Sequence, residues 1–129
     1  VRLLFMYILM VREKRAENHR NYAPISAGTV PEVSIIVPAY NEEVNIVRTI
    51  SNLKQQDYPS FHIYLVDDGS SDNTLARARE QFGNDAEVTI IEKENGGKAS
   101  ALNRGIAACT TEYVVCIDAE SNRISFLMR

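Results

Sequence analysis

Four short apolar segments, each followed by polar residues and then by a helix-like stretch, constrain the fold of this chain most. The first, residues 33–37, consists largely of β-branched apolar residues in succession, which is typical of a strand buried on both faces. The others are residues 62–66, 88–91 and 112–117. Strands that alternate with helices form right-handed βαβ units. The pattern therefore predicts an α/β fold with a Rossmann-like parallel sheet of alternating strands and helices.

Apolar residues recur at helical spacing between these segments. Asn41 is the predicted N-cap of the first helix, with Glu42 and Glu43 in its first turn. Gly83 is the predicted C-terminal cap of the second helix. The positions that define the three helical faces are Ile46, Val47, Ile50 and Leu53; Leu75, Ala78 and Phe82; and Ala99, Leu102, Ile106 and Cys109.

Composition excludes several broad classes of protein. The chain has 129 residues, of which 45% are hydrophobic, and a net charge of −3, so it is too apolar and too weakly charged for a disordered segment. A dedicated nucleic-acid binder would be basic, so we expect no nucleic-acid partner. Cys109 and Cys116 are too few for a disulfide scaffold, and we expect buried free thiols.

The chain begins with an apolar run at residues 3–11, followed by a mostly basic cluster at residues 12–15. Spanning a bilayer takes roughly 20 such residues, so this run is too short by itself. We expect residues 1–17 to form a helix that either docks on the domain surface or is the end of a transmembrane segment. The basic flank favours the second alternative and places the following domain in the cytoplasm. Residues 18–32 are a predicted polar linker, and residues 33–129 are the folded domain.

Polar clusters follow every predicted strand. Because the carboxyl ends of parallel strands meet at one edge, and ligands of open α/β sheets bind beyond that edge, the sequence predicts a binding site there. The singled-out residues of the four clusters are Pro38, Tyr40 and Glu42; Asp67 and Asp68; Lys98; and Asp118 and Glu120.

The two middle clusters each have two interpretations. Asp67 and Asp68 fit a simple turn with a helix cap, or acceptors for an imide N–H or a sugar hydroxyl. Residues 95–97 fit an ordinary loop, or a glycine-rich backbone that approaches phosphate closely. In the second case Lys98 is a point charge at a helix N-terminus. A positive charge there is unfavourable for the helix dipole, and a bound anion would explain its presence.

Asp118 and Glu120 fit either a strand-end turn or a divalent-metal site. Two carboxylates one residue apart supply the hard oxygen ligands that Mg²⁺ or Mn²⁺ prefers, and a diphosphate completes the shell. His19 lies in the linker and His62 begins a strand, so we expect both to be structural or solvated rather than ligands.

Together the clusters resemble the family 2 glycosyltransferases, which have the GT-A fold. The resemblance covers residues 31–120 and rests on VSIIVPAYNEE, LVDDGSSDNT, ENGGKASALNRG and VVCIDAE. It is nearest to the membrane-bound processive synthases of poly-N-acetylglucosamine, hyaluronan, chitin and cellulose. It implies that residues 33–129 are the nucleotide-sugar-binding, N-terminal part of such a domain, behind a membrane helix.

The resemblance implies inverting transfer from a UDP-sugar to a glycan or lipid-linked acceptor, with Mg²⁺ or Mn²⁺. Asp68 would contact uracil with support from Asp67, and Lys98 would hold the base or diphosphate. Asp118 would face the ribose and the metal, and Glu120 would ligate the metal. The residues that would line the uridine pocket are Pro38, Tyr40 and Glu42.

Two departures from the family pattern limit this expectation. Glu120 stands where the family motif ends in Asp, and its longer side chain displaces the ligand oxygens. The family continues with an acceptor half, an Asp general base and a Gln-x-x-Arg-Trp motif, whereas this chain has no Trp and no matching base after Glu120. We therefore expect weak binding of UDP and Mn²⁺, and no transfer by this chain alone.

Other functions remain as alternatives. The first is a non-catalytic module that binds a nucleotide or nucleotide sugar. A phosphoacceptor receiver also clusters acids and a lysine at strand ends, but its acid pair follows the first strand rather than the second. A dehydrogenase is disfavoured because no Gly-x-Gly-x-x-Gly follows the first strand.

We also expect the fourth strand to be exposed, without its usual neighbours.

Overall fold

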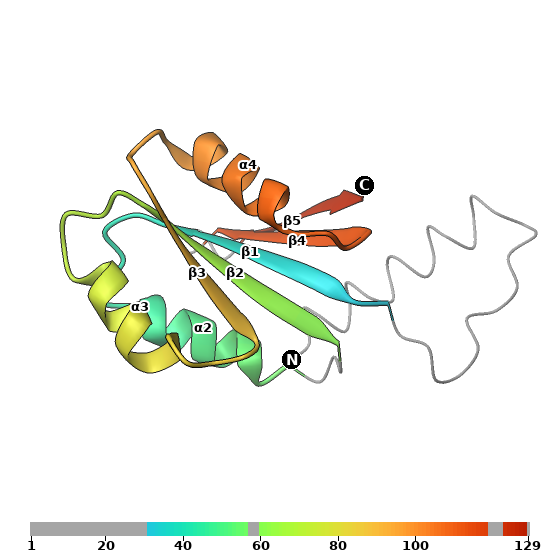
Figure 1. Cartoon of the computed structure of the whole chain (residues 1–129), viewed down its shortest axis with the longest axis horizontal. Helices are drawn as coiled ribbons and strands as arrows, with labels where there is room; N and C mark the ends of the chain where they lie inside the picture. The colour runs from blue at the N-terminus through green and yellow to red at the C-terminus, as the bar shows by residue number, and fades with distance from the viewer. Residues whose placement is uncertain (1–30, 57–59, 119–122, 129) are drawn as a thin grey trace, which may run out of the picture.

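The computed structural model describes residues 31–56, 60–118 and 123–128 (Figure 1). The alternation of strands and helices predicted from the sequence is confirmed through the fourth strand. The elements are, in order, β1 (Val33–Ala39), α2 (Ile46–Lys54), β2 (Phe61–Asp68), α3 (Thr74–Phe82), β3 (Val88–Lys93), α4 (Lys98–Ala108), β4 (Tyr113–Asp118) and β5 (Arg123–Met128).

The predicted N-terminal helix, residues 1–17, lies outside the described residues, as does nearly all of the predicted linker. Within the described ranges no helix is long and apolar enough to cross a membrane.

One mixed sheet runs through the molecule in the strand order β3-β2-β1-β4-β5. Strands β1 to β4 are parallel to one another, and β5 pairs antiparallel to β4, with Asp118 opposite Arg123. The expectation of an exposed fourth strand was therefore wrong. The chain reverses after β4 and returns along it, so that β4 has a neighbour on both sides.

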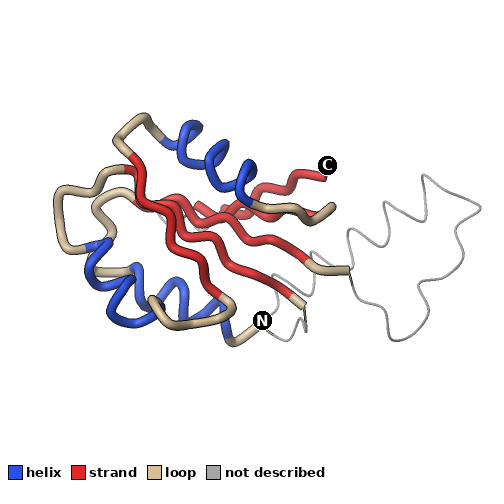
Figure 2. Tube along the Cα trace, in the orientation of Figure 1, coloured by secondary structure: helices blue, strands red, loops and turns tan. Residues whose placement is uncertain are grey.

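Helices cover both faces of this sheet, with α4 on one face and α2 and α3 on the other (Figures 1 and 2). Alternate residues of β1 divide between the two cores. Ile35 and Val37 pack in the core under α2 and α3, whereas Ile36 packs with Val66 and Ala101 in the core under α4. Apart from the buried Ser34, the run at residues 33–37 is apolar because successive side chains enter two different cores.

Helix α4 packs closely on the sheet through small residues. A Cβ atom at Gly105 would lie 2.5 Å from Cγ2 of Ile36, so the helix backbone itself contacts the β1 side chain. Ala101 and Gly105 are buried, and Ala99 is exposed. The prediction that Ala99 lies on the packed face was wrong. The helix lies so close to the sheet that the contact is made by Ala101 and Gly105, two small residues one turn apart.

The start of α2 also differs from the prediction. Asn41 is not its N-cap, because the helix begins at Ile46 with Asn45 at the cap. Asn41 instead has a left-handed φ of 51°, and its side-chain oxygen accepts a hydrogen bond from the Ser71 amide at 2.9 Å. A tertiary partner thus occupies the oxygen that would have capped the helix. Gly83 is the C-cap of α3, as predicted.

The cysteines and the described histidine are structural. Cys109 and Cys116 are buried free thiols, as expected. His62, near the start of β2, lies 2.6 Å from Thr89 Oγ1 through Nε2, and its ring packs at 4.8 Å from that of Tyr64. His19 lies outside the described residues.

Candidate functional site

The loops that follow β1, β2 and β3 gather at one end of the sheet (Figure 2). The strand register explains this: Ala39 pairs with Asp67, and Asp68 pairs with Lys93, so the three strands end side by side. Strand β4 runs parallel to β1 and ends at Asp118. The convergence of polar clusters that the sequence predicts is therefore present for the described loops.

Asp68 joins two of these loops. The residue is 4% exposed, and Oδ1 accepts hydrogen bonds from Lys93 Nζ at 2.6 Å and from the Gly96 amide at 3.0 Å. Oδ2 accepts a third from the Gly97 amide at 2.9 Å. One carboxylate therefore anchors the whole glycine-rich loop to the end of β2.

These contacts set the ionisation of Asp68. Burial by itself would raise the pKa of this carboxyl, but the Lys93 ammonium and the two glycine amides together lower it below the ordinary 3.8. Asp68 is therefore a charged group under neutral conditions, although its side chain is almost inaccessible to solvent.

Gly69 brings the same two loops into direct contact. It has a φ of 71°, and a Cβ atom there would lie 2.6 Å from the amide nitrogen of Asn95. Only glycine satisfies both the left-handed backbone and this close approach. The turn after β2 and the loop before α4 therefore pack backbone against backbone.

Asp67 has a more local role. It is 2% exposed, and its oxygens accept hydrogen bonds from Ser70 Oγ at 2.5 Å and from the Ser70 amide at 3.2 Å. Asp67 therefore bonds both the backbone and the side chain of a residue three places on in its own turn. Asp67 thus shapes the loop in which Asp68 and Gly69 lie.

The loop after β1 is tied to the loop after β2. The Asn41 amide donates to Ser70 Oγ at 3.0 Å, and the Glu42 amide donates to Thr74 Oγ1 at 2.8 Å. Asp72 accepts from the Thr74 amide at 3.0 Å. Burial would raise the pKa of Asp72, but its hydrogen bonds lower it. Three loops distant in sequence therefore form one connected rim.

Four more of the predicted residues lie in these loops or next to them. Tyr40 is 48% exposed, and Pro38 and Glu42 are half-buried. Lys98 is exposed and is the first residue of α4, immediately after Gly97 with its φ of 94°. The N-terminus of α4 therefore lies in the rim, with its first amide groups at the loop that Asp68 anchors.

The predicted metal ligands are less completely described. The backbone of Asp118 ends β4, and Glu120 lies outside the described residues. Over residues 31–56, 60–118 and 123–128 no three His, Cys, Asp or Glu side chains are grouped to hold a metal ion. The metal site stays a prediction.

Lys93 is a site residue that the sequence pattern did not single out. It ends β3, and its only sequence signal is a lysine at the end of a strand. Its importance depends on the register that sets it beside Asp68, and that register is a property of the fold.

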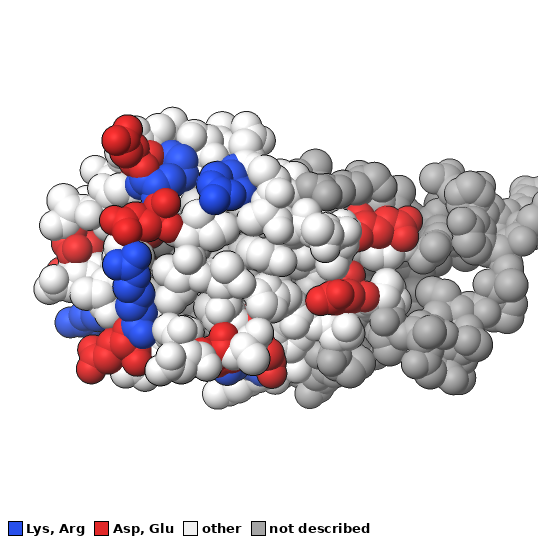
Figure 3. Space-filling model, in the orientation of Figure 1, with Lys and Arg blue, Asp and Glu red and all other residues white. Residues whose placement is uncertain are grey.

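On the face in Figure 3, most lysine and arginine side chains lie toward the end of the sheet where the rim is found, interspersed with acidic ones.

Known proteins resemble this chain in sequence and in fold. Residues 34–121 match the model of the family described as glycosyl transferase family 2. A poly-beta-1,6-N-acetyl-D-glucosamine synthase of Staphylococcus epidermidis is 38% identical over 93 residues, covering 71% of this chain and 22% of the synthase. The chain spans about a quarter of the length of the curated relatives it matches.

Two solved structures show the same architecture. The mannosyltransferase PcManGT from Pyrobaculum calidifontis, in complex with GDP-Man and Mn²⁺, superposes with a TM-score of 0.66 at 32% identity, over 86% of this chain and 34% of that one. TarS of Staphylococcus aureus, in complex with UDP-GlcNAc, gives a TM-score of 0.61 at 32% identity, over 67% and 26%. With the family match over most of its length, the chain belongs to glycosyl transferase family 2 and has a GT-A type of fold.

Proposed function

We propose that this chain is the donor-binding part of an inverting glycosyltransferase that uses a UDP-sugar and a glycan or lipid-linked acceptor. The observation that carries the proposal is the rim, in which Asp68 anchors a glycine-rich loop and the start of α4 beside the loops after β1 and β2. Family membership supports the reaction class, and UDP-GlcNAc in TarS supports the donor class.

The base of the nucleotide would lie against Pro38, Tyr40 and Glu42. Tyr40 offers an exposed aromatic ring, and aromatic rings stack on nucleobases at little cost in conformational entropy. Asp68 uses three acceptor positions for its own chain, and a carboxylate has about four, so one position remains for the imide N–H of uracil. Asp67 supports this contact by holding the turn.

The diphosphate would lie at the N-terminus of α4. Backbone amides at a helix start favour an anion, and Gly97 lets the backbone come close because it carries no side chain. Lys98 adds a positive charge at the same point and would help to neutralise the leaving nucleotide.

Asp118 and Glu120 would hold Mg²⁺ or Mn²⁺. Their carboxylate oxygens suit these hard cations, and Mn²⁺ in PcManGT supports a divalent ion in a related fold. A bound ion would supply positive charge to the diphosphate as it leaves. We expect the ion to be held weakly, because the side chain of Glu120 is longer than that of Asp. Its carboxylate oxygens therefore lie farther from the backbone than the oxygens of an Asp at this position.

We further propose that residues 3–11 and their basic flank associate with a membrane, with the domain on its cytoplasmic side. The sequence pattern supports this, because an apolar run followed by basic residues follows the positive-inside rule.

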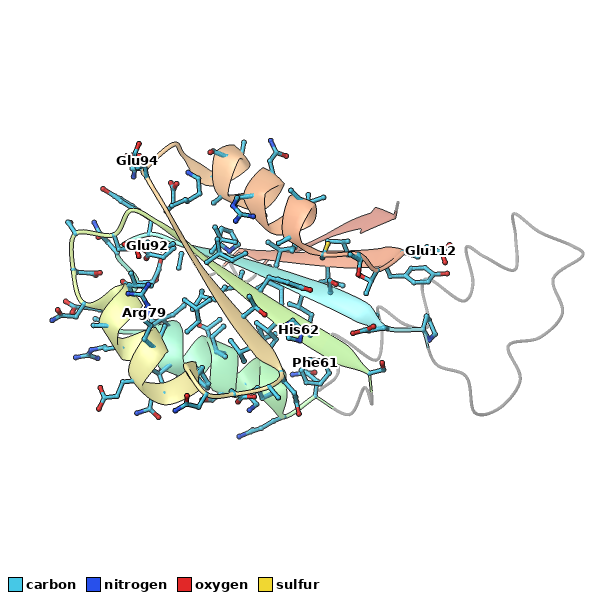
Figure 4. All side chains as sticks on the ribbon, viewed as in Figure 1. Phe61, His62, Arg79, Glu92, Glu94 and Glu112 are labelled. Atoms are coloured by element: carbon cyan, nitrogen blue, oxygen red, sulfur yellow. The ribbon has the colours of Figure 1, made fainter. Side chains whose placement is uncertain are left out.

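Calorimetry with UDP, with and without Mn²⁺, tests the donor site. We expect weak binding that strengthens with Mn²⁺, and we expect Asp118→Asn to abolish the strengthening. Glu112→Gln is the matched control, because Glu112 is an exposed acid at the other end of the same strand (Figure 4). If no nucleotide releases heat or raises the melting temperature of the wild-type chain, the donor-site proposal is wrong.

A further inference from the structure

We propose that Lys93 is a positioning residue of the donor site. Through Asp68, it holds the main chain of residues 94–97 in the arrangement that receives the nucleotide diphosphate. This inference rests on the proposed function, and it assigns the site a residue from a strand that the family motifs do not include. Lys93 would act without touching the donor itself.

The contacts of Lys93 place it under the loop. Its Nζ donates to Asp68 Oδ1 at 2.6 Å and to the carbonyl oxygen of Glu94 at 2.5 Å. The side chains of this ion pair are 16% exposed for Lys93 and 5% for Asp68. One ammonium therefore bonds both the anchor of the loop and the first residue of the loop, which Figure 4 shows at the tip beyond β3.

Asp68 needs this partner in order to hold the loop. A buried carboxylate without a compensating charge is unfavourable, and it then takes up a proton or draws in water. A protonated Asp68 would bond the Gly96 and Gly97 amides more weakly, because charge-assisted hydrogen bonds are about twice as strong as neutral ones. Loss of the Lys93 ammonium would therefore loosen the two glycine amides as well.

The loop is shaped to fit around this ammonium. A Cβ atom at Gly96 would lie 3.0 Å from Lys93 Nζ and 2.8 Å from Ser100 Oγ. The backbone at Gly96 thus passes directly over the lysine and against the first turn of α4. Because Lys98 follows one residue after Gly97, the position of the loop also sets the position of Lys98.

Two measurements on the whole chain test this role. The first is amide hydrogen exchange at Gly96 and Gly97, followed by NMR without ligand; the second is the affinity for UDP by calorimetry. For Lys93→Met we expect exchange at both glycines to accelerate about tenfold or more, the effect of losing a charge-assisted hydrogen bond, and UDP affinity to fall by a similar factor. Lys93→Arg keeps the positive charge and should lose less in both measurements.

Lys54→Met is the matched control. It removes the ion pair of Lys54 with Asp85, which is also partly buried but lies at the amino ends of β2 and β3, away from the rim. We expect it to lower the melting temperature while exchange at Gly96 and Gly97 and UDP affinity stay as in the wild type.

The outcomes separate this inference from the donor-site proposal. If the wild type binds UDP and Lys93→Met binds it equally well, Lys93 is not a positioning residue, whatever happens to stability. Wild-type exchange rates at Gly96 and Gly97 in Lys93→Met would overturn the positioning role in the same way. If the wild type binds no nucleotide, the proposed function fails first and the positioning role fails with it.

Discussion

Asp68 remains charged inside the fold because three donors of its own chain surround it. The sequence offers an Asp-Asp-Gly-Ser turn, and nothing in that string distinguishes the two aspartates. In the structure Asp67 bonds within its own turn, whereas Asp68 bonds across 25 or more residues to the next loop. The two neighbours therefore differ in what they stabilise, and substitutions at each should have different effects.

Acid should weaken the fold partly through Asp68. Its pKa in the folded chain is below the ordinary 3.8, so its deprotonated form stabilises the fold fully above that pH and loses this effect as the pH falls through the lowered value. Asp72 and Asp85 have lowered pKa values and act in the same window. We expect the free energy of unfolding, measured with urea at a series of pH values, to decline less steeply in acid for Asp68→Asn.

At neutral pH the same substitution should cost about 2 kcal/mol, because the buried donors lose a charged acceptor. Glu80→Gln, at an exposed position of α3, provides the control curve. An acid limb of Asp68→Asn that is parallel to the wild type would contradict the prediction.

Alanine substitutions at Gly69 and Gly97 distinguish the cost of backbone strain from the cost of steric crowding. Both have positive φ, but a Cβ atom at Gly69 would meet the Asn95 backbone at 2.6 Å, and one at Gly97 would meet nothing within 4 Å. We expect Gly97→Ala to cost about 1–3 kcal/mol from backbone strain alone, because its φ of 94° and ψ of 169° lie in a region open essentially only to glycine. Gly69→Ala should cost distinctly more, as measured by denaturant unfolding, and equal losses would show that the loops do not pack as described.

At the scale of elements, the contact of α4 with β1 decides how the glycine-rich loop is presented. The helix packs through Ala101 and Gly105, and this close approach places the N-terminus of α4 in the rim. The loop between β1 and α2 is shaped differently. Hydrogen bonds to the β2–α3 loop hold it in place, and a helix cap does not.

Gly105→Ala should destabilise the chain despite favouring the helix. Helix propensity alone predicts a gain of about 1 kcal/mol, but the added methyl would lie 2.5 Å from Ile36, and overpacking a core costs about 1–3 kcal/mol. Ala107→Gly, on the exposed side of α4, should follow propensity and cost about 1 kcal/mol. Thermal unfolding measures both, and a stabilised Gly105→Ala chain would refute the close packing.

At the scale of the molecule, the chain is a mixed five-stranded sheet with helices on both faces and one rim where three described loops meet. Two partly buried ion pairs lie at opposite ends of this sheet. The ion pair of Lys54 with Asp85 lies at the amino ends of the strands, and that of Lys93 with Asp68 lies at the carboxyl ends. Substitutions at the first pair should therefore affect folding without affecting the rim.

The 129 residues assayed by themselves should bind UDP without transferring sugar. In the proposed site the rim would bind the nucleotide and its diphosphate, and these 129 residues contain no counterpart of the general base that the family resemblance implies. Incubation with a radiolabelled UDP-sugar and candidate glycan acceptors should yield no labelled product. Turnover above that of a Lys98→Ala control would show that a base is present in this chain.

The sequence by itself determined the α/β alternation, the parallel direction of β1 to β4 and the edge of the sheet at which the polar loops gather. These features follow from local periodicity and from the rule that loops after parallel strands share one edge. The tertiary structure alone decided the antiparallel β5, the true start of α2 and the pairing of Lys93 with Asp68. Strand β5 depends on its pairing with β4, and the other two features depend on partners at least 25 residues away, so local spacing encodes none of them. Lys93 lies beside Asp68 only because β2 and β3 pair in the register that the packed cores select.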